Sequence, residues 1–394
     1  MNRLSTVSVC AWITVLLVMT QAWHNAAGSG IERIQAVSST GDEQIVYSWY
    51  TDRCADQDIP DSPPRAFRDY KGDVHLFSTH EENRALVGSD FEHLHHACSV
   101  VYRGAHSDDP SRYDDRQWLT SFTTADGRQI HALVHNEFQG NRRKEVCPSG
   151  RYLSCWYNAI TYAQSDDGGY SFKQEAPPKN LVAAPPYKYL GEIGRPVGYF
   201  QPTNIVEQDG YFYFLFLAAE LGSQRRGLCA ARTKDPSDAR SWRGWSGSGF
   251  DVEFVDPYQA TAFDPEEHVC RPVAGRLFEV GSLSLDTRSG LFLMLTSISE
   301  GNGNIRFAPG PYLSASKDLL NWSEPMPVNR DNQAVSDPNY RYGFFALIDE
   351  SSHSLDFSTI SNKPSLFLYY VKTSKLGAPL ARMLVKRSIR IPVQ

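Results

Sequence analysis

The sequence predicts an all-β protein, and more specifically a five-bladed β-propeller with long loops between its strands. Aromatic residues make up 12% of the 394 residues, whereas Met occurs only 5 times, and this composition favours sheets over helical bundles. Strand–turn–strand segments recur at intervals of about 55 to 85 residues, beginning at Arg65, Trp118, Gln201, Val280 and Tyr342. The residues between these segments show no helical periodicity, so each segment is expected to form the first strands of one small sheet.

Turn signals support this division into small sheets. Asp-Gly pairs at 126–127 and 209–210 stand at the centres of two of the hairpins, as two-residue hairpin turns require. The segment 165–172 (SDDGGYSF) fits the S-x-D-x-G-x-[ST]-[FW] turn called an Asp box. In this turn the Asp side chain accepts hydrogen bonds from its own loop and the aromatic ring packs beneath. Such turns join the outer strands of propeller blades, so we expect a structural role.

The hairpin count sets the domain organisation. We expect one propeller domain over residues 31–394, with blades at about 57–113, 114–195, 196–262, 272–335 and 336–394. The strand at 44–50 or the tail at 383–391 would complete one blade and close the ring. The alternative is a six-bladed ring that uses residues 31–56 as a partial blade.

The amino terminus has the features of a secretory signal over residues 1–28. Arg3 precedes an apolar run at 9–19, and small residues follow at 26–28. The run is shorter than the ~20 apolar residues that a membrane span needs. The mature protein is therefore expected to be secreted or periplasmic and free of the membrane, with an uncleaved anchor as the alternative.

Cysteine usage agrees with export. Cys10 lies inside the signal, and the other six cysteines are Cys54, Cys98, Cys147, Cys155, Cys229 and Cys270. An even number in an exported chain predicts disulfides. Fifteen pairings are available to six cysteines, and we favour the sequential one because it closes neighbouring segments. No C-x-x-C pair occurs, which argues against a metal site.

Charge limits the class of partner. The chain has 39 Lys and Arg against 45 Asp and Glu, so its formal net charge is −6. A nucleic-acid-binding protein needs a basic face, so we expect no nucleic-acid partner. We expect a monomer.

Propeller geometry predicts where a site would form. Polar residues just before inner strands and just after second strands should converge on one rim of the central funnel. Carboxylates are frequent at these positions, which include Asp61, Glu279, Glu137 and Glu220. Crowded carboxylates raise one another's pKa values, and this suits acid–base chemistry on sugars.

The segments 61–79 (DSPPRAFRDYKGDVHLFST), 207–216 (EQDGYFYFLF) and 316–322 (SKDLLNW) give the chain a resemblance to glycoside hydrolase family 43 and related five-bladed propeller glycosidases. This resemblance implies an inverting mechanism with an Asp base on blade one, an Asp pKa modulator on blade two and a Glu acid on blade three. Asp61 matches the first position, while Ser121 and Gln201 occupy the other two. Further carboxylates would then come from elsewhere on the rim.

The residues themselves suggest the following roles. Asp61 is expected to act as base or nucleophile, with Glu279 or Glu220 as the acid and Glu137 tuning the pair. The alternative for each glutamate is a rim salt bridge to an arginine such as Arg195. Expected substrate-binding residues are Arg65, Arg68, His80, His135, Asn136, Gln201, Asn204 and Tyr342. No metal ligands are assigned and no cofactor is expected to be required, although a structural divalent cation in the funnel is left open.

These observations lead to one favoured function and two alternatives. The favoured function is a secreted glycoside hydrolase-like propeller that acts on a polysaccharide or glycan through funnel carboxylates. The first alternative is a non-catalytic carbohydrate-binding propeller, which Ser121 and Gln201 favour. The second is a sialidase-like enzyme, suggested by the Asp box.

Overall fold

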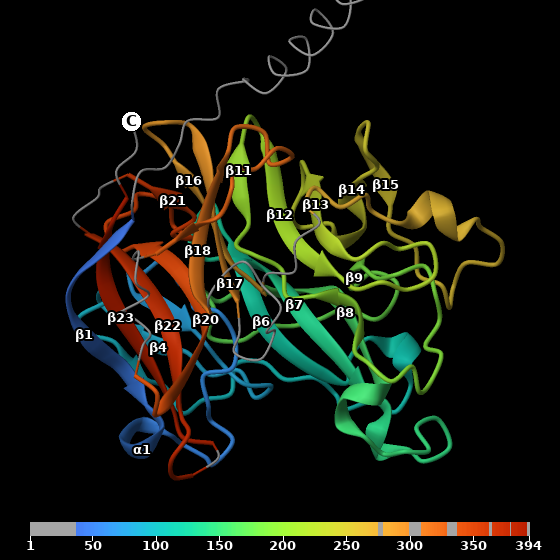
Figure 1. Cartoon of the computed structure of the whole chain (residues 1–394), viewed down its shortest axis with the longest axis horizontal. Coiled ribbons are helices and arrows are strands. Elements are labelled where there is room, and N and C mark those ends of the chain that lie inside the picture. The colour runs from blue at the N-terminus through green and yellow to red at the C-terminus, as the bar shows by residue number, and fades with distance from the viewer. Residues whose placement is uncertain are drawn as a thin grey trace, which may run out of the picture.

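The protein is nearly all β-structure (Figure 1). It is a computed structural model that describes residues 37–274, 279–298, 309–328, 337–361, 365–378 and 380–391, so the expected signal at 1–28 lies outside the described residues. The helices within these ranges are short: α1 (Trp49–Asp52) and the 3₁₀ helices η1 (Pro110–Arg112), η2 (Gly140–Arg142), η3 (Tyr152–Cys155), η4 (Ala239–Ser241) and η5 (Pro265–His268). None of the helices in the described ranges has the length and apolar character needed to cross a membrane.

The first two meanders follow the chain in order. One is an antiparallel sheet of β2 (Arg65–Arg68), β3 (Val74–Phe77), β4 (Leu86–Gly88) and β5 (His95–His96). The next contains β6 (Arg116–Thr123), β7 (Ile130–Gln139), β8 (Trp156–Ser165) and β9 (Leu181–Ala183). The buried patterns of β3 and β7 explain why these segments form strands with both faces covered.

The third meander is joined to the second. It comprises β10 (Val197–Phe200), β11 (Val206–Gln208), β12 (Tyr211–Ala218), β13 (Gly227–Thr233), β14 (Arg243–Trp245) and β15 (Phe250–Glu253). A short parallel pairing of β10 with β8 links the two meanders into one ten-stranded hydrogen-bonded sheet. The turn between β11 and β12 has positive φ at Asp209 (54°) and Gly210 (72°), as the Asp-Gly pair predicts.

The last two sheets use the rest of the chain. One contains β16 (Glu279–Asp286), β17 (Leu291–Ile298), β18 (Gly310–Ser316) and β19 (Met326–Pro327), with β21 (Thr359–Ile360) parallel to β16. The other contains β20 (Tyr340–Asp349), β22 (Leu366–Ser374), β23 (Arg382–Arg390) and β1 (Ser38–Ser48). Both ends of the described chain therefore meet in one sheet, because β1 pairs antiparallel with β23.

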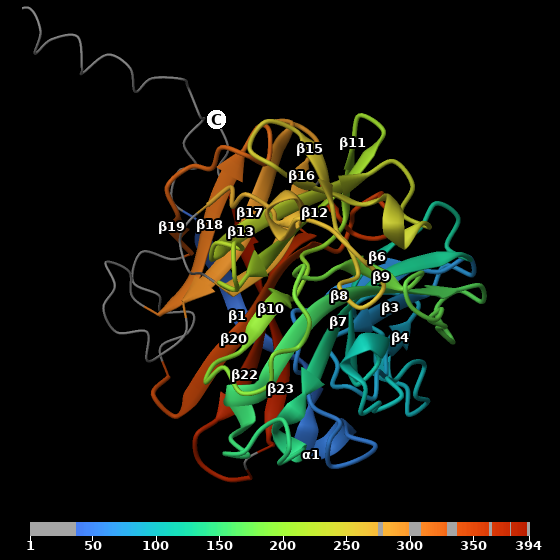
Figure 2. The same cartoon turned by 90° about the vertical axis from the view of Figure 1, so that its right-hand side faces the viewer.

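Buried hydrophobic clusters join each meander to the next. Phe67 and Phe122 pack together between the first and second meanders. Similar clusters lie between the second and third, the third and fourth, and the fourth and last. A further cluster that includes Leu76 and Tyr369 joins the last sheet to the first. Figures 1 and 2 show the sheets standing next to one another in this order.

Two turns between the second meander and the first show how closely the sheets meet. Gly127, in the β6–β7 turn, has φ of 69°, and a Cβ there would lie 2.6 Å from backbone atoms of Asp69 and Tyr70. Only glycine fits this approach. In the predicted Asp box, Asp167 accepts hydrogen bonds from Ser165 Oγ at 2.7 Å and from the backbone N–H of Ser171 at 2.9 Å. The Asp box thus has the structural role expected of it.

The cysteines pair sequentially, as predicted. The disulfides are Cys54–Cys98, Cys147–Cys155 and Cys229–Cys270. Three disulfides fit an oxidising, extracytoplasmic compartment.

Candidate active site

Strand β7 presents a row of polar side chains on one face. Successive side chains of a strand point to opposite faces, so His135, Glu137 and Gln139 lie on the same side. The neighbouring strand β6 places Arg116 opposite Glu137 and Trp118 opposite His135. These five residues line a common pocket. The alternation of His135, Glu137 and Gln139 in the sequence could have predicted this row.

Asp61 reaches the same pocket from the segment before β2. Its carboxylate is ion-paired with Arg382 at the start of β23. The same Nη1 of Arg382 donates a hydrogen bond to the carbonyl of Pro60 at 3.0 Å. This double contact fixes the segment.

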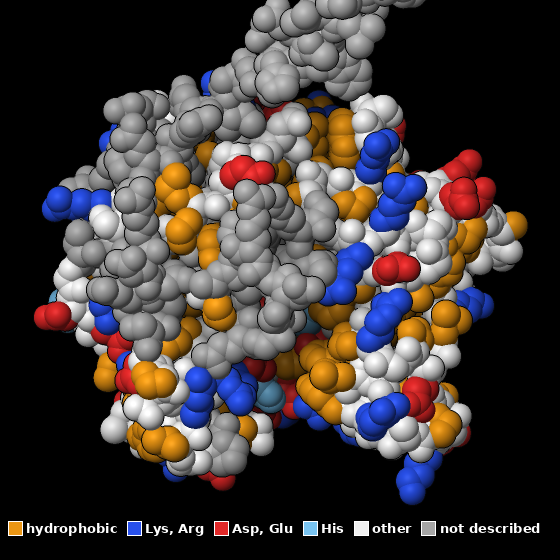
Figure 3. Space-filling model, viewed as in Figure 1, with side chains coloured by type: hydrophobic (Ala, Val, Ile, Leu, Met, Phe, Trp, Pro, Cys, Tyr) orange, Lys and Arg blue, Asp and Glu red, His pale blue; other side chains and the backbone are white. Residues whose placement is uncertain are grey.

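The pocket has a volume of about 400 Å³, a size typical of small-ligand sites. It brings together most of the residues expected at the funnel rim, namely Asp61, His80, His135, Glu137, Gln201 and Glu279. In the space-filling view, acidic side chains and a histidine are visible together in a hollow below the centre of the face (Figure 3).

Glu137 is the buried carboxyl of the pocket. Burial raises its pKa, and the nearby charge of Asp61 acts in the same direction. Two hydrogen bonds oppose this shift: Oε1 lies 3.0 Å from Nε2 of His135, and Oε2 accepts from Nε2 of Gln139 at 2.8 Å. A carboxyl whose pKa is raised by burial and whose orientation is fixed is suited to general acid catalysis.

The charged groups of the pocket shift the pKa values of the same neighbouring side chains. Burial raises the pKa of Tyr152 to about 12, and the charges of Glu137 and Asp61 add to the rise while Arg116 opposes it. Burial also lowers the pKa of His80, against the effect of Asp61, whose Oδ2 lies 4.0 Å from the imidazole Nε2. These shared influences indicate that Asp61, Glu137 and Arg116 face one space.

Aromatic rings form much of the remaining wall. Trp118, Tyr152, Trp156 and Phe200 all line the pocket. The rings of Tyr152 and Trp156 lie 5.0 Å apart at their centroids, and Tyr152 is 51% exposed. Aromatic faces of this kind stack on the apolar faces of sugar rings. Trp156 is thus one of the aromatic residues placed at the site.

The disulfide Cys147–Cys155 lies beside this wall, since Tyr152 precedes Cys155 and Trp156 follows it. We expect the double variant C147A/C155A to lose about 2 to 3 kcal/mol of unfolding free energy, because the bond closes a short loop. Thermal unfolding of the variant beside the native protein measures this loss. An unchanged unfolding free energy would contradict the expectation.

Several expected residues lie elsewhere. Glu220 is exposed beyond β12 and does not line the pocket; its backbone carbonyl accepts from Arg195 Nη1 at 2.9 Å. Arg65 is buried and donates to the carbonyls of Pro64 and Gly281. Arg68 donates to the carbonyl of Gly72 at 2.8 Å and lies over the Phe357 ring.

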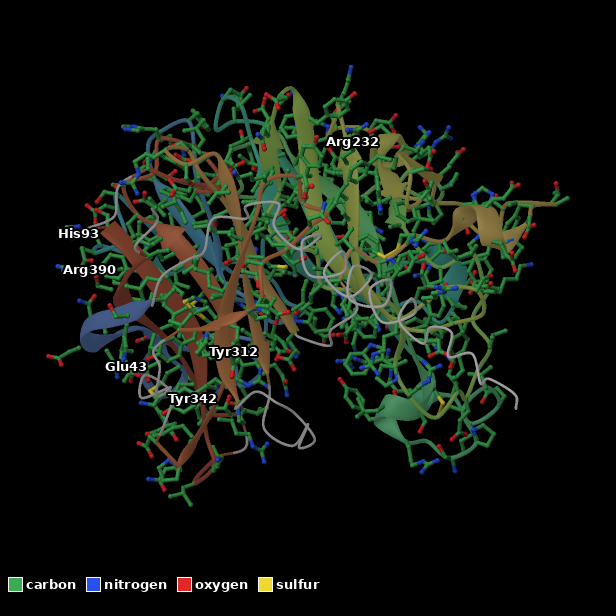
Figure 4. The ribbon with its side chains drawn as sticks, turned by 45° about the horizontal axis from the view of Figure 1, so that its top comes forward. Glu43, His93, Arg232, Tyr312, Tyr342 and Arg390 are labelled. Atoms are coloured by element: carbon green, nitrogen blue, oxygen red, sulfur yellow. A yellow bond between two sulfur atoms is a disulfide. The ribbon has the colours of Figure 1, made fainter. Side chains whose placement is uncertain are left out.

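The remaining three expected binding residues serve the packing of the sheets. Asn136 is buried on the face of β7 opposite the pocket row. Asn204 accepts a hydrogen bond from the backbone N–H of Leu283 at 3.4 Å. Tyr342 packs against the cluster between the last two sheets, and Figure 4 shows it on the same side as Glu43 of β1.

Two groups of residues in the described ranges have the spacing of metal ligands, but their chemistry does not fit a metal site. Cys54, Asp58 and His96 lie within ligand distance of one another, as do Cys147, Cys155 and Glu192. Each of these cysteines is in a disulfide, and a disulfide sulfur is not the thiolate that binds metals. Asp58 and His96 instead form a hydrogen bond of 2.6 Å.

No family model and no curated protein matches the chain. Among solved structures, it is similar to the endo-arabinase from Bacteroides thetaiotaomicron, at 13% identity and a TM-score of 0.49, over 89% of this chain and 98% of that one. It is similar to the alpha-L-arabinanase of Cellvibrio cellulosa at 12% identity and a TM-score of 0.46, over 83% and 91%. For the catalytic domain of the GH62 alpha-L-arabinofuranosidase of Coprinopsis cinerea, the values are 12% and 0.47, over 91% and 98%. These are glycoside hydrolases, the class that the sequence resembles.

Proposed function

We propose that this protein is an exported glycoside hydrolase that acts on a glycan in the pocket around Asp61 and Glu137. One observation carries the proposal: an ion-paired carboxylate and a buried carboxyl with a raised pKa face the same pocket. Glycoside hydrolysis needs such a pair, one group ionised and the other protonated. The aromatic wall supports a sugar as the ligand.

The proposed chemistry divides between the two carboxyls. Glu137 gives its proton to the glycosidic oxygen as the bond to the anomeric carbon breaks. Asp61 either deprotonates the attacking water or attacks the anomeric carbon itself. Glu137 thus takes the acid role that the sequence left to Glu279 or Glu220. Glu279 is exposed at the pocket edge, where it can contact sugar hydroxyls.

We propose the five-bladed propeller as the architecture that builds this pocket. The hydrophobic clusters link successive meanders and then the last sheet to the first, as a closed ring requires. Pocket residues come from the segment before β2, from β6 and β7, and from β23. Radial packing of small sheets explains how such distant segments meet. The disulfides and the signal-like residues 1–28 support export.

The experiment is a screen of the purified mature protein against a glycan panel. Release of new reducing ends is measured beside the double variant D61N/E137Q. Hydrolysis by the native protein and its loss in the variant are expected. Glycan binding without any product would instead favour the non-catalytic carbohydrate-binding alternative.

The pH profile tests the role of Glu137. Activity is expected to fall on the alkaline side as the pH rises through the raised pKa of Glu137, because the acid then loses its proton. Gln139 stabilises the ionised form through its hydrogen bond, so Q139M should move this alkaline limb to higher pH. The measurement is kcat/KM against pH for both proteins. If the alkaline limb of Q139M coincides with that of the native protein, Glu137 is not the general acid.

The same shift has a consequence for stability. The unfolded chain ionises Glu137 at its ordinary, lower pKa, so the folded state binds the extra proton between the two values. Unfolding free energy should therefore decline as pH rises through this window, and less so in E137Q.

A further inference from the structure

Two arginines of the pocket use only part of their hydrogen-bonding capacity. Arg116 contacts Glu81 through Nη1 alone, at 3.1 Å from Oε1 and 3.0 Å from Oε2. Arg382 likewise uses Nη1 for both Asp61 and Pro60. Among the described residues, no hydrogen bond is made by Nε or Nη2 of either arginine. Nε and Nη2 form an edge that matches a carboxylate in a two-pronged contact.

Two further donors of the pocket also have no acceptor. The indole N–H groups of Trp118 and Trp156 are buried and have no partner in the described part of the chain. By contrast, the carboxyl groups of Asp61 and Glu137 already accept hydrogen bonds. Buried donors of this kind are costly unless a ligand supplies acceptors. A carboxylate supplies acceptors only, whereas each sugar hydroxyl also brings a donor.

Both arginines already face a carboxylate, Arg116 that of Glu81 and Arg382 that of Asp61. Since Glu279 also lines the pocket, the net charge of the site does not by itself attract an anion. Recognition of an anion therefore depends on the unused donors of Arg116, which form charge-assisted hydrogen bonds with a carboxylate.

We propose that the pocket recognises an acidic glycan, and that Arg116 binds the carboxylate of a uronic acid residue through its Nε–Nη2 edge. Arg116 is favoured over Arg382 because Arg382 holds Asp61. This inference rests on the proposed function for the site but names the substrate class. Trp118, opposite His135 on the same face, donates its indole N–H to the same sugar.

Binding of matched monosaccharides tests the proposal without requiring turnover. The probes are the methyl glycosides of glucuronic acid and glucose, of galacturonic acid and galactose, and of galactose 6-sulfate, titrated by NMR or calorimetry. At least one uronide is expected to bind roughly 10- to 100-fold more tightly than its neutral partner, the range for a hydrogen-bonded charged group. Equal binding within a pair, or preference for the sulfate ester over both uronides, overturns the proposal.

The R116K variant tests the named residue. Lys keeps the charge beside Glu81 but lacks the fork, so the preference for the uronide should fall to about threefold or less. The matched control is R103K, since Arg103 is a surface residue that lies 3.5 Å from Glu82; its preference should be unchanged. Thermal melts establish that both variants are folded. Retention of the full preference in R116K overturns the assignment to Arg116.

These results are separable from the proposed function. Uronide-selective binding with no hydrolysis of any uronate-containing polysaccharide would leave the recognition intact and refute the hydrolase. Hydrolysis of neutral glycans with no uronide binding would leave the hydrolase intact and refute the recognition. Comparison of one acidic polysaccharide with its carboxyl-reduced form gives both readouts on the same backbone.

Discussion

Replacing Asp61 with Asn is expected to reduce glycan hydrolysis by roughly 10⁴-fold, the upper range for loss of a proton-transferring group. Asn cannot accept a proton from water or attack the anomeric carbon at a useful rate. The change is nearly isosteric and leaves Arg382 bonded to Pro60, so the fold should persist. Turnover of the best substrate from the glycan panel is the measurement.

The control for Asp61 lies in the same segment. Asp56 is largely exposed and pairs with Arg53 at 3.5 Å outside the pocket, so D56N should keep its activity. A small external anion such as azide or formate should restore part of the activity of D61N if Asp61 acts directly. Loss without rescue, together with a large drop in Tm, would reduce Asp61 to a structural partner of Arg382.

The second large effect is expected at Glu137. E137Q removes the acidic proton but keeps the size of the side chain, so hydrolysis of natural glycosides should fall by roughly 10²- to 10⁴-fold. Aryl glycosides with acidic leaving groups need little protonation, so their hydrolysis should fall much less. The ratio of the two losses is therefore the diagnostic quantity, measured as kcat/KM on both substrate types.

A matched glutamate provides the control for this experiment. Glu175 is exposed, pairs with Lys179 at 3.3 Å and lies away from the pocket, so E175Q should behave like the native protein. Equal losses on natural and activated substrates in E137Q would show that Glu137 does not act as the acid.

The sheet architecture could be predicted from local signals. Asp-Gly turns and alternating strands are encoded within ~20 residues, and the meanders begin near the expected positions. The Cys147–Cys155 pair was equally accessible because its members are close in sequence. Convergence of rim carboxylates was also expected, and Asp61, Glu137 and Glu279 do line one pocket.

The exact residues of the site were harder to predict, because bulges change which way a strand presents its side chains. In β20, a register shift between Gly343 and Ala346 accompanies a φ of 53° at Phe344. Tyr342 then packs against the cluster between the last two sheets while Phe344 lines the pocket, although regular alternation would place them on one face. A shift between Leu119 and Ser121 acts similarly in β6.

Long-range pairing was the second obstacle. Arg382 lies 321 residues from Asp61, and no local pattern in the sequence connects the two. Arg116 and Trp118 were overlooked for a different reason. The expected rim position in this blade was Ser121, but β6 begins at Arg116 and Ser121 is buried within it.

Pairing of β1 with β23 connects the amino-terminal end of the described chain to the pocket. Met383, next to Arg382, pairs with Ser48 of β1. The arginine that is ion-paired with Asp61 therefore lies at the end of the β1–β23 pairing. Proteolysis that removed β1 would leave β23 unpaired on one side. We expect this to weaken the ion pair between Arg382 and Asp61. The proposed activity would then depend on the pairing of β1 with β23, although β1 itself does not line the pocket.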